Sequence, residues 1–425
     1  RAVMSAAGTG EEPGADGRTV WSFDMPQAIP TYLLALAVGH LDARELGPRS
    51  RIYAEPEVVE KSAWEFAEVE GMIDAAARLF GPYEWDRFDM LVMPPSFPYG
   101  GMENPRLTFL TPTLIAGDRS QVNVVAHELA HSWSGNLVTN ATMNDFWLNE
   151  GFTDYFERRI MERMEGPAYA EMLAVLGYDD LLETLEDLGR ENPDTRLKLE
   201  LTARDPDLGM SDIAYEKGYL FLVALERSVG RQRFDEFLAN YFHRHAFSTM
   251  TTEGFVDEVQ QRLNPPLDLG AWIDAPGLPD FTPPTSKLFA QVDAALASWQ
   301  GGQPATSLKT EHWSSHEWLH FLRRLPEDLT VAQMAELDQA FDFTHSHNAE
   351  LLFQWLRTAV RVHYEPAYPE VEEFLVEVGR RKFVEPLFET IIAQPGGKVW
   401  AAKIFAKARP NYHSLTRSAI EDLLR

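Results

Sequence analysis

The segment Val124-Val-Ala-His-Glu-Leu-Ala-His-Ser-Trp decides how the rest of the chain is interpreted. His127 and His131 are four positions apart, which on an α-helix places both imidazoles on one face, close enough to bind one metal ion. Glu128 lies at the edge of that face, where its carboxylate can accept a proton from water. The pattern therefore predicts a helix that carries two zinc ligands and a general base.

A hydrolytic zinc site needs a third protein ligand and one position left open for water. The segment Trp147-Leu-Asn-Glu-Gly supplies this ligand, because Glu150 comes nineteen positions after His131 in a second amphipathic stretch. The chain contains no cysteine, which excludes thiolate zinc sites, disulfides and thiol nucleophiles. We therefore expect one Zn²⁺ per chain, bound by His127, His131 and Glu150.

A second match to the same motif, His316-Glu-Trp-Leu-His320, shows that the motif alone is not decisive. The residue nineteen positions beyond His320 is Gln339, which is not an acid. Ser314 and Glu317 fit the capping box of a helix start. We therefore expect a structural helix at this position and no second zinc site.

Before the first motif, Tyr99-Gly-Gly-Met-Glu-Asn-Pro leads into a strand, Leu107-Thr-Phe-Leu. Paired glycines allow a close approach of the backbone to a ligand. By itself the segment is typical of a turn with a solvated acid. Beside a zinc helix, it predicts that Glu103 is a fixed negative charge for the ammonium group of a substrate. The residues expected to contact substrate here are Tyr99, Gly100, Gly101, Met102 and Glu103.

The composition limits the class of protein. The 425 residues include 65 acidic and 38 basic side chains, for a net charge of −27. This balance argues against nucleic-acid binding, which requires a basic surface. There is no run of 18 apolar residues, so we expect no membrane-spanning helix. The chain starts at Arg1 instead of Met, so we expect its true N-terminus upstream; a signal peptide cannot be judged, and a cytoplasmic location is the expectation.

The N-terminal part has the pattern of strands. Residues 1–18 are rich in Gly, Ala and charge and are expected to form a mobile end or loop. Residues 19 to about 50 predict strands, with Tyr32-Leu-Leu-Ala-Leu-Ala-Val as a buried one. These strands are too few to close a sheet domain and are typical of the tail of one. Residues 120–270 are expected to be mostly helical.

The C-terminal part has the pattern of helices in series. Residues 274–286 are rich in proline and are typical of a linker. Eight amphipathic stretches follow, separated by Pro and Gly, and predict a domain of stacked helical pairs. These stretches lie near residues 288–300, 314–325, 330–343, 347–363, 368–380, 384–394, 397–408 and 413–425.

Together these residues resemble the zinc aminopeptidases of the gluzincin type, whose signature joins a Gly-x-Met-Glu-Asn motif to HExxH, eighteen residues and Glu. Gly100-Gly-Met-Glu-Asn, His127-Glu-Leu-Ala-His and Glu150 match this signature fully. Pro94-Pro-Ser-Phe-Pro and Phe146-Trp-Leu-Asn-Glu-Gly look most like the leukotriene hydrolase and aminopeptidase B branch. The likeness extends along nearly the whole chain.

The resemblance implies an α+β, mostly helical fold with the active site in a cleft between its parts. The implied parts are a remnant of an N-terminal β-domain at 1–49, a thermolysin-like zinc catalytic domain at 50–274, a linker at 275–287 and a C-terminal stacked-helix domain of the HEAT or armadillo kind at 288–425. Most of the family's N-terminal domain, which contributes a polar residue to the pocket for the substrate amine, is absent.

The resemblance also implies roles for single residues. Tyr215 looks like the tyrosine that hydrogen-bonds the tetrahedral oxyanion; the alternative is a core or capping tyrosine. Arg380 and Lys382 look like the pair that receives the C-terminal carboxylate of a peptide; the alternative is a basic surface turn. Asp207 matches an acid in the inner part of the pocket, or else forms an Asx turn. Met210 replaces the second tyrosine of leukotriene-converting members.

The expected function is therefore a zinc-dependent aminopeptidase that hydrolyses the N-terminal residue from short peptides, with Glu128 as general base and Tyr215 as oxyanion stabiliser. One alternative is a zinc epoxide hydrolase of the leukotriene hydrolase type, with Asp207 directing water. Another is a catalytically silent helical scaffold, although a scaffold needs no general base. The expected partners are short peptides with a free N-terminus; the preferred first residue and the oligomeric state are not predicted.

Overall fold

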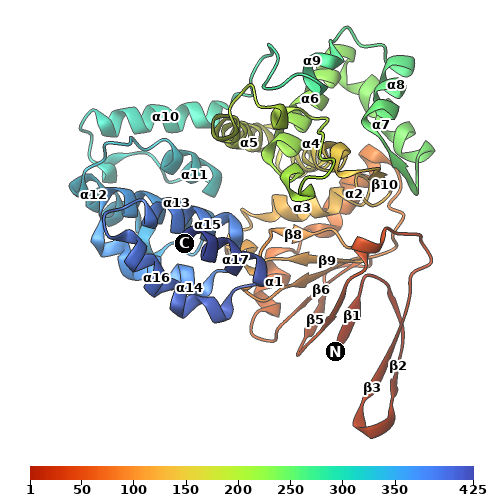
Figure 1. Cartoon of the computed structure of the whole chain (residues 1–425), viewed down its shortest axis with the longest axis horizontal. Coiled ribbons are helices and arrows are strands. Elements are labelled where there is room, and N and C mark those ends of the chain that lie inside the picture. The colour runs from red at the N-terminus through yellow and green to blue at the C-terminus, as the bar shows by residue number, and fades with distance from the viewer.

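The computed structural model describes all 425 residues as a mostly helical α+β protein. A five-stranded sheet lies beside the zinc-motif helix, with strand order β5-β6-β7-β9-β8 (Figure 1). Strands β6, β7 and β9 are parallel, and the outer strands β5 and β8 are antiparallel to their neighbours. The five strands are β5 (Asp42–Glu45), β6 (Ser50–Ala54), β7 (Phe88–Val92), β8 (Gly101–Met102) and β9 (Leu107–Leu110). The short strand β8 is thus an edge strand.

The N-terminal residues form strands, so the expectation of a mobile end at 1–18 is wrong. Strands β2 and β3 form a hairpin that projects from the body of the molecule, and β1 pairs with β4 (Figure 1). The partner of β1 lies more than thirty residues along the chain, so the composition of residues 1–18 alone does not reveal this strand. The bounds are β1 (Ala2–Met4), β2 (Ala7–Pro13), β3 (Thr19–Asp24) and β4 (Leu36–Val38).

The predicted buried strand from Tyr32 to Val38 is also wrong. A 3-10 turn occupies Thr31–Leu33, and Leu36 and Val38 on β4 are 59% and 75% exposed. Strand β4 pairs only with β1, in a two-stranded sheet, so its other edge is unpaired. The predicted division at residue 49 separates β5 from β6, although these two strands are paired.

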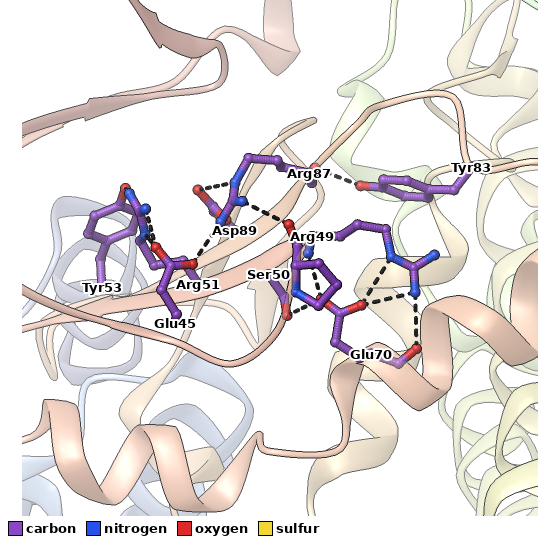
Figure 2. Close-up of polar contacts among 10 residues, drawn as sticks. Glu45, Arg49, Ser50, Arg51, Tyr53, Glu70, Tyr83, Arg87 and Asp89 are labelled. Carbon is purple, nitrogen blue, oxygen red and sulfur yellow. Dashed lines mark hydrogen bonds and ion pairs between the residues drawn. The ribbon is translucent and has the colours of Figure 1, made fainter.

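Ion pairs fix the outer part of the sheet to the neighbouring helix (Figure 2). The Arg49 guanidinium, just before β6, donates to the Glu70 carboxylate of helix α2 at 2.9 and 3.0 Å. The Arg87 guanidinium donates to Asp89 of β7 at 2.8 Å and to Glu45 of β5 at 3.3 Å. The first contact joins the start of β6 to α2, and the second joins β5 to β7.

Nine helices and two further strands complete the middle of the chain. The long helix α4 contains Glu150 and is buried on every side from Trp147 to Met161, so it is not the amphipathic helix that we expected. It passes through the centre of this unit, in contact with α2, α3, α5 and α6. The bounds are α1 (Val59–Glu65), α2 (Val69–Phe80), α3 (Val122–Ala130), β10 (Val138–Asn140), α4 (Trp147–Glu165), α5 (Pro167–Leu188), α6 (Gly218–Val229), α7 (Arg231–Arg244), β11 (Ser248–Met250), α8 (Thr252–Arg262) and α9 (Leu269–Ile273).

The eight predicted C-terminal helices are confirmed, and they pack alternately: α11 against α13, α13 against α15, α15 against α17, and α14 against α16. They surround a second hydrophobic core, which Met172 and Leu176 of α5 join from the catalytic side. No helix of the protein is both long and apolar enough to cross a membrane. The bounds are α10 (Lys287–Gln300), α11 (Ser315–Arg323), α12 (Val331–Phe341), α13 (Ala349–Val362), α14 (Tyr368–Glu377), α15 (Arg381–Ile392), α16 (Gly397–Ala408) and α17 (Ser414–Leu424).

Candidate active site

Three buried ligand atoms converge where α3 meets α4. The Nε2 atoms of His127 and His131 are 3.2 Å apart, and Glu150 Oε2 lies 3.4 Å from the first and 3.5 Å from the second. Zinc bonds of about 2.0–2.1 Å at tetrahedral angles place neighbouring ligand atoms about 3.3–3.4 Å apart. Glu150 Oε2 has no hydrogen-bond partner within the protein. The three atoms therefore fit a single Zn²⁺.

The remaining nitrogen of each imidazole is held by the protein. His127 Nδ1 lies 3.0 Å from Asp154 Oδ1 and 3.2 Å from Glu157 Oε2. His131 Nδ1 lies 3.0 Å from the Ser134 carbonyl oxygen. Such contacts fix the tautomer that leaves Nε2 free to bind a metal. Burial by itself would lower the pKa of His127, but its acidic neighbours raise this pKa well above the usual value; the site thus has an excess of negative charge that a divalent cation would offset.

Asp154 and Glu157, which contact His127 Nδ1, were not predicted from the sequence. Both follow Glu150 on α4, at four and seven positions along the helix, and therefore lie on the same face as the ligand. This spacing was visible in the sequence once Glu150 had been chosen. Tyr32 is half-exposed on the 3-10 turn Thr31–Leu33, in a segment that was predicted to be a buried strand; partial burial and the charges of Glu103 and Glu150 raise its pKa.

Glu128 lies against the edge strand. Its side chain is buried, and its Oε2 atom has no hydrogen-bond partner. A Cβ atom on Gly101 of β8 would lie 2.2 Å from Glu128 Oε1, so only glycine allows the strand to pass this close. Burial raises the pKa of Glu128 to about 7, against the lowering effect of the two histidines. A carboxylate with a pKa near neutrality is suited to general base catalysis.

Glu103 faces the same centre from just beyond β8. Ligand-type atoms of Glu103, Glu128 and His131 all lie within 4.8 Å of one another. Burial raises the pKa of Glu103. Its main-chain oxygen accepts a hydrogen bond of 2.8 Å from the Asn136 side chain, which fixes the segment. Of the other residues expected here, Met102 is partly buried in β8.

Tyr215 lies beside the zinc ligand His127. It belongs to one π-helical turn, Ile213–Lys217, a rare conformation that is often found at functional sites. Its ring is nearly parallel to the His127 ring, with centroids 6.2 Å apart. Burial and the surrounding carboxylates raise the pKa of Tyr215 well above its ordinary value, so its hydroxyl remains a proton donor.

Arg380 and Lys382 occupy different environments. Arg380 is buried, and a Cβ atom on Gly100 would lie 2.9 Å from its Nη2 atom, so it adjoins the entry to β8. Lys382 is half-exposed and donates to both oxygens of Glu350 at 2.7 and 2.9 Å. Arg380 is therefore directed toward the site, whereas Lys382 forms an ion pair with Glu350.

Asp207 lies on a solvent-exposed turn, and its expected place in the inner part of the pocket stays a prediction. Its side chain is exposed on the turn Pro206–Gly209, and its amide donates to Asp205 Oδ1 at 3.0 Å. This is the Asx turn that the sequence left as the alternative. Met210, at the end of the turn, is 44% exposed, and Tyr99 is 39% exposed beside Phe97.

Comparisons with known proteins agree with this geometry. The peptidase family M1 domain matches residues 64–274, and the C-terminal domain of leukotriene A4 hydrolase matches residues 313–424. Leukotriene A-4 hydrolase of Xenopus laevis is 37% identical over 99% of this chain and 72% of its own length. Leucine aminopeptidase 2 of Pyricularia oryzae is 38% identical over 99% of this chain and 71% of its own.

Solved structures match in the same way. Yeast LTA4 hydrolase in complex with bestatin aligns with a TM-score of 0.89 at 31% identity, over 100% of this chain and 72% of that one. An M1 zinc metallopeptidase of Deinococcus radiodurans, bound to a Tyr-Ser-Ala substrate, aligns with a TM-score of 0.53 at 25% identity. The alignment covers 67% of this chain and 63% of that one. The expected fold class and the zinc cofactor are thereby confirmed. The chain belongs to peptidase family M1, a family of zinc hydrolases, and within it to the leukotriene A4 hydrolase branch.

Proposed function

We propose that the protein is a zinc-dependent aminopeptidase that removes the N-terminal residue from short peptides. Glu103 carries this proposal, because its carboxylate lies within 4.8 Å of the Glu128 and His131 atoms at the metal centre. A fixed anion at this distance holds the free α-ammonium group of a peptide. The first peptide bond then lies beside the zinc ligands, and a peptide with a blocked N-terminus is not bound in this way.

The side chains around the metal centre have separate roles in the reaction. Zn²⁺, when bound by His127, His131 and Glu150, supplies a Lewis acid that activates water and polarises the carbonyl group. Glu128 accepts a proton from the attacking water and returns it to the leaving amine. Tyr215 keeps its proton, as its raised pKa requires, and donates a hydrogen bond to the developing oxyanion.

The edge strand determines how a peptide enters. Strand β8 pairs with β9 on one side only, so its other side is available to an extended peptide that adds as a further strand. Because Gly101 has no side chain, β8 can lie directly against Glu128. Arg380 lies at the entry to the strand, where it can receive the carboxylate of a short peptide.

Hydrolysis of aminoacyl-aminomethylcoumarin tests the proposal. We expect turnover that a chelator abolishes and added zinc restores, and no turnover of the N-acetylated compound. Turnover that persists in chelator, or equal turnover of the acetylated compound, would contradict it. The epoxide hydrolase alternative is not proposed, since it relied on Asp207, whose side chain is exposed on the turn Pro206–Gly209.

A further inference from the structure

We propose that Glu216 and Lys217 are positioning residues, which hold the π-helical turn Ile213–Lys217 so that the Tyr215 hydroxyl is aimed at the developing oxyanion. Both side chains act through Tyr215, the residue that precedes them. The inference rests on the proposed function, because it requires Tyr215 to donate a hydrogen bond during peptide hydrolysis. It adds the contacts that keep an irregular turn in register with the zinc ligands.

The π-helical turn lies directly against the helix that carries the third zinc ligand. Turns of this kind are rare and depart from the regular hydrogen-bond pattern of the helix. A Cβ atom on Gly151, the residue after that ligand, would lie 2.7 Å from Gly218 Cα and 3.0 Å from the Ala214 carbonyl oxygen. The two backbones are therefore in contact, and a shift of the turn changes where Tyr215 lies relative to the zinc ligands.

Glu216 fixes the turn to α4 through a buried ion pair. Arg158 of α4 donates to Glu216 from Nη1 to Oε2 at 2.9 Å and from Nη2 to Oε1 at 2.5 Å. The guanidinium also stacks on the ring of Tyr219 in α6, with Cζ 3.9 Å from the ring centroid. A pair with two parallel hydrogen bonds has a defined geometry. It therefore specifies the position of the residue directly after Tyr215.

Helix α5 closes around the same pair. A Cβ atom on Gly177 of α5 would lie 2.0 Å from Glu216 Oε1 and 2.4 Å from Arg158 Nη2. Only glycine at this position lets the helix pack so closely against both charged groups. The turn is thus held at a point where α4 and α5 meet it together.

Lys217 joins the end of the π-helical turn to two further segments. Its Nζ atom donates to the Thr195 carbonyl oxygen at 2.8 Å and to the Ala275 carbonyl oxygen, just after α9, at 3.0 Å. The side chain is fully buried, and burial lowers the pKa of Lys217 to about 7. An apolar side chain would avoid the cost of burying an ammonium group, so stability alone does not account for a lysine here. Its two directed hydrogen bonds determine where the turn ends.

The two anchors follow Tyr215 directly and attach to different elements. Loss of either one should leave the ligands on α3 and α4 in place and allow the Tyr215 hydroxyl to move. A displacement of about 1 Å at a reacting centre can lower a rate by about 100-fold. The expected defect is therefore in catalysis and not in zinc binding.

A double-mutant cycle with Tyr215→Phe on aminoacyl-aminomethylcoumarin tests the inference. Lys217→Met and Glu216→Gln should each retain zinc and lower kcat by about 10- to 100-fold with little change in KM. In a Tyr215→Phe background the same substitutions should lower kcat by less than about threefold, because they act through a hydroxyl that is already absent. The matched control is Asp235→Asn, which alters the ion pair of Arg159, the neighbour of Arg158 on α4, and should leave kcat unchanged in both backgrounds.

Each other result has a definite meaning. Normal kcat in folded Lys217→Met and Glu216→Gln enzymes, or equal losses with and without the Tyr215 hydroxyl, would overturn the inference and leave the aminopeptidase intact. Failure of both variants to give folded, zinc-loaded protein would also overturn it, since the contacts would then serve folding alone. Absence of turnover by the unmutated enzyme, or normal kcat in Tyr215→Phe, would instead contradict the proposed function and, with it, the inference.

Discussion

Helices α3 and α11 both carry the pattern His-Glu-x-x-His, yet only the first can hold a metal. On α3, the Nε2 atoms of His127 and His131 converge on Glu150 of α4. On α11, His320 Nε2 lies 2.8 Å from Asp293 and its ring stacks on Phe289, so it is engaged in packing. The same spacing therefore gives a ligand pair in one environment and core contacts in the other.

The two glutamates differ in the same way. Glu128 Oε2 has no hydrogen-bond partner, and its carboxylate is free to exchange a proton. Glu317 accepts hydrogen bonds from the Ser314 amide and hydroxyl at 2.8 and 2.9 Å, which confirms the predicted capping box. One acid is kept available for chemistry, whereas the other stabilises the start of its helix.

The difference shows what the motif requires. A metal site needs a carboxylate on a second helix that packs against the first, and Glu150 meets this requirement through the contact between α3 and α4. The corresponding position after α11 is Gln339, which is exposed on α12. The decisive information thus lies nineteen positions beyond the motif.

The largest difference should appear when one histidine is removed from each motif. His131→Ala should lose its bound zinc, because two ligands do not hold the ion against dilution. His320→Ala should retain one zinc per chain and should only melt at a lower temperature. Elemental analysis of the purified proteins measures this directly. Loss of zinc from the His320→Ala protein would contradict the assignment of the ligands.

The two glutamates provide the next comparison. Glu128→Gln should retain zinc but lower kcat by about 10²–10⁴-fold, the contribution of a positioned general base. Glu317→Gln should leave kcat unchanged, because glutamine also serves in a capping box. Steady-state kinetics with a coumarin substrate distinguishes these outcomes. A Glu128→Gln enzyme with normal kcat would show that another group accepts the proton.

A smaller effect should follow from the acids behind the imidazoles. Asp154→Asn weakens the anchor of His127 Nδ1 and should lower zinc affinity by about 10–100-fold. Asp293→Asn, which alters the corresponding contact of His320, should leave zinc affinity unchanged. Titration against a competing chelator gives both values. Equal affinities in the two variants would mean that Glu157 alone orients His127.

The smallest effect concerns stability at acidic pH. Burial lowers the pKa of His316 to about 4, below the value of about 6.5 in an unfolded chain. At acidic pH the unfolded chain therefore binds more protons than the folded protein. The contribution of neutral His316 to stability is complete above about pH 6.5 and is lost as the pH falls toward 4. Between pH 7 and pH 5, the free energy of unfolding of the unmutated protein should therefore decrease by about 2 kcal/mol more than that of His316→Gln. Urea unfolding of the zinc-loaded proteins measures this difference, and equal losses would show that His316 is not held neutral by burial.

The sequence was most informative where local signals coincide. The C-terminal helices were predicted because Pro and Gly separate their amphipathic stretches. The structure shows in addition that Ser286, Thr330 and Asn348 cap the starts of α10, α12 and α13. His127, His131 and Glu128 were predicted because helical spacing determines which side chains share a face, and Glu150 because it follows His131 by nineteen positions. The comparisons confirm the family and the fold to which these predictions led.

Features that depend on distant pairing were not visible. Strand β1 is completed by β4, more than thirty residues away, so its own glycine- and charge-rich surroundings gave no strand signal. Asp207 matches a motif, but its exposure depends on how the turn Pro206–Gly209 folds. The hydrogen bond from the Gly379 amide to the Pro95 carbonyl oxygen likewise joins segments nearly three hundred residues apart in the chain.

The central claim is that Glu103 makes this zinc enzyme an aminopeptidase, and Glu103→Ala tests it most directly. The measurement is the ratio of kcat/KM for a free peptide to that for its N-acetylated form. Loss of one side of a buried ammonium–carboxylate pair costs roughly 2–5 kcal/mol, so kcat/KM for the free peptide should fall by about 30- to several-thousand-fold. The kcat/KM for the acetylated peptide, which is a poor substrate even for the unmutated enzyme, should fall much less. The ratio of the two values should therefore decrease strongly. An unchanged ratio would show that Glu103 does not hold the amine and would contradict the account.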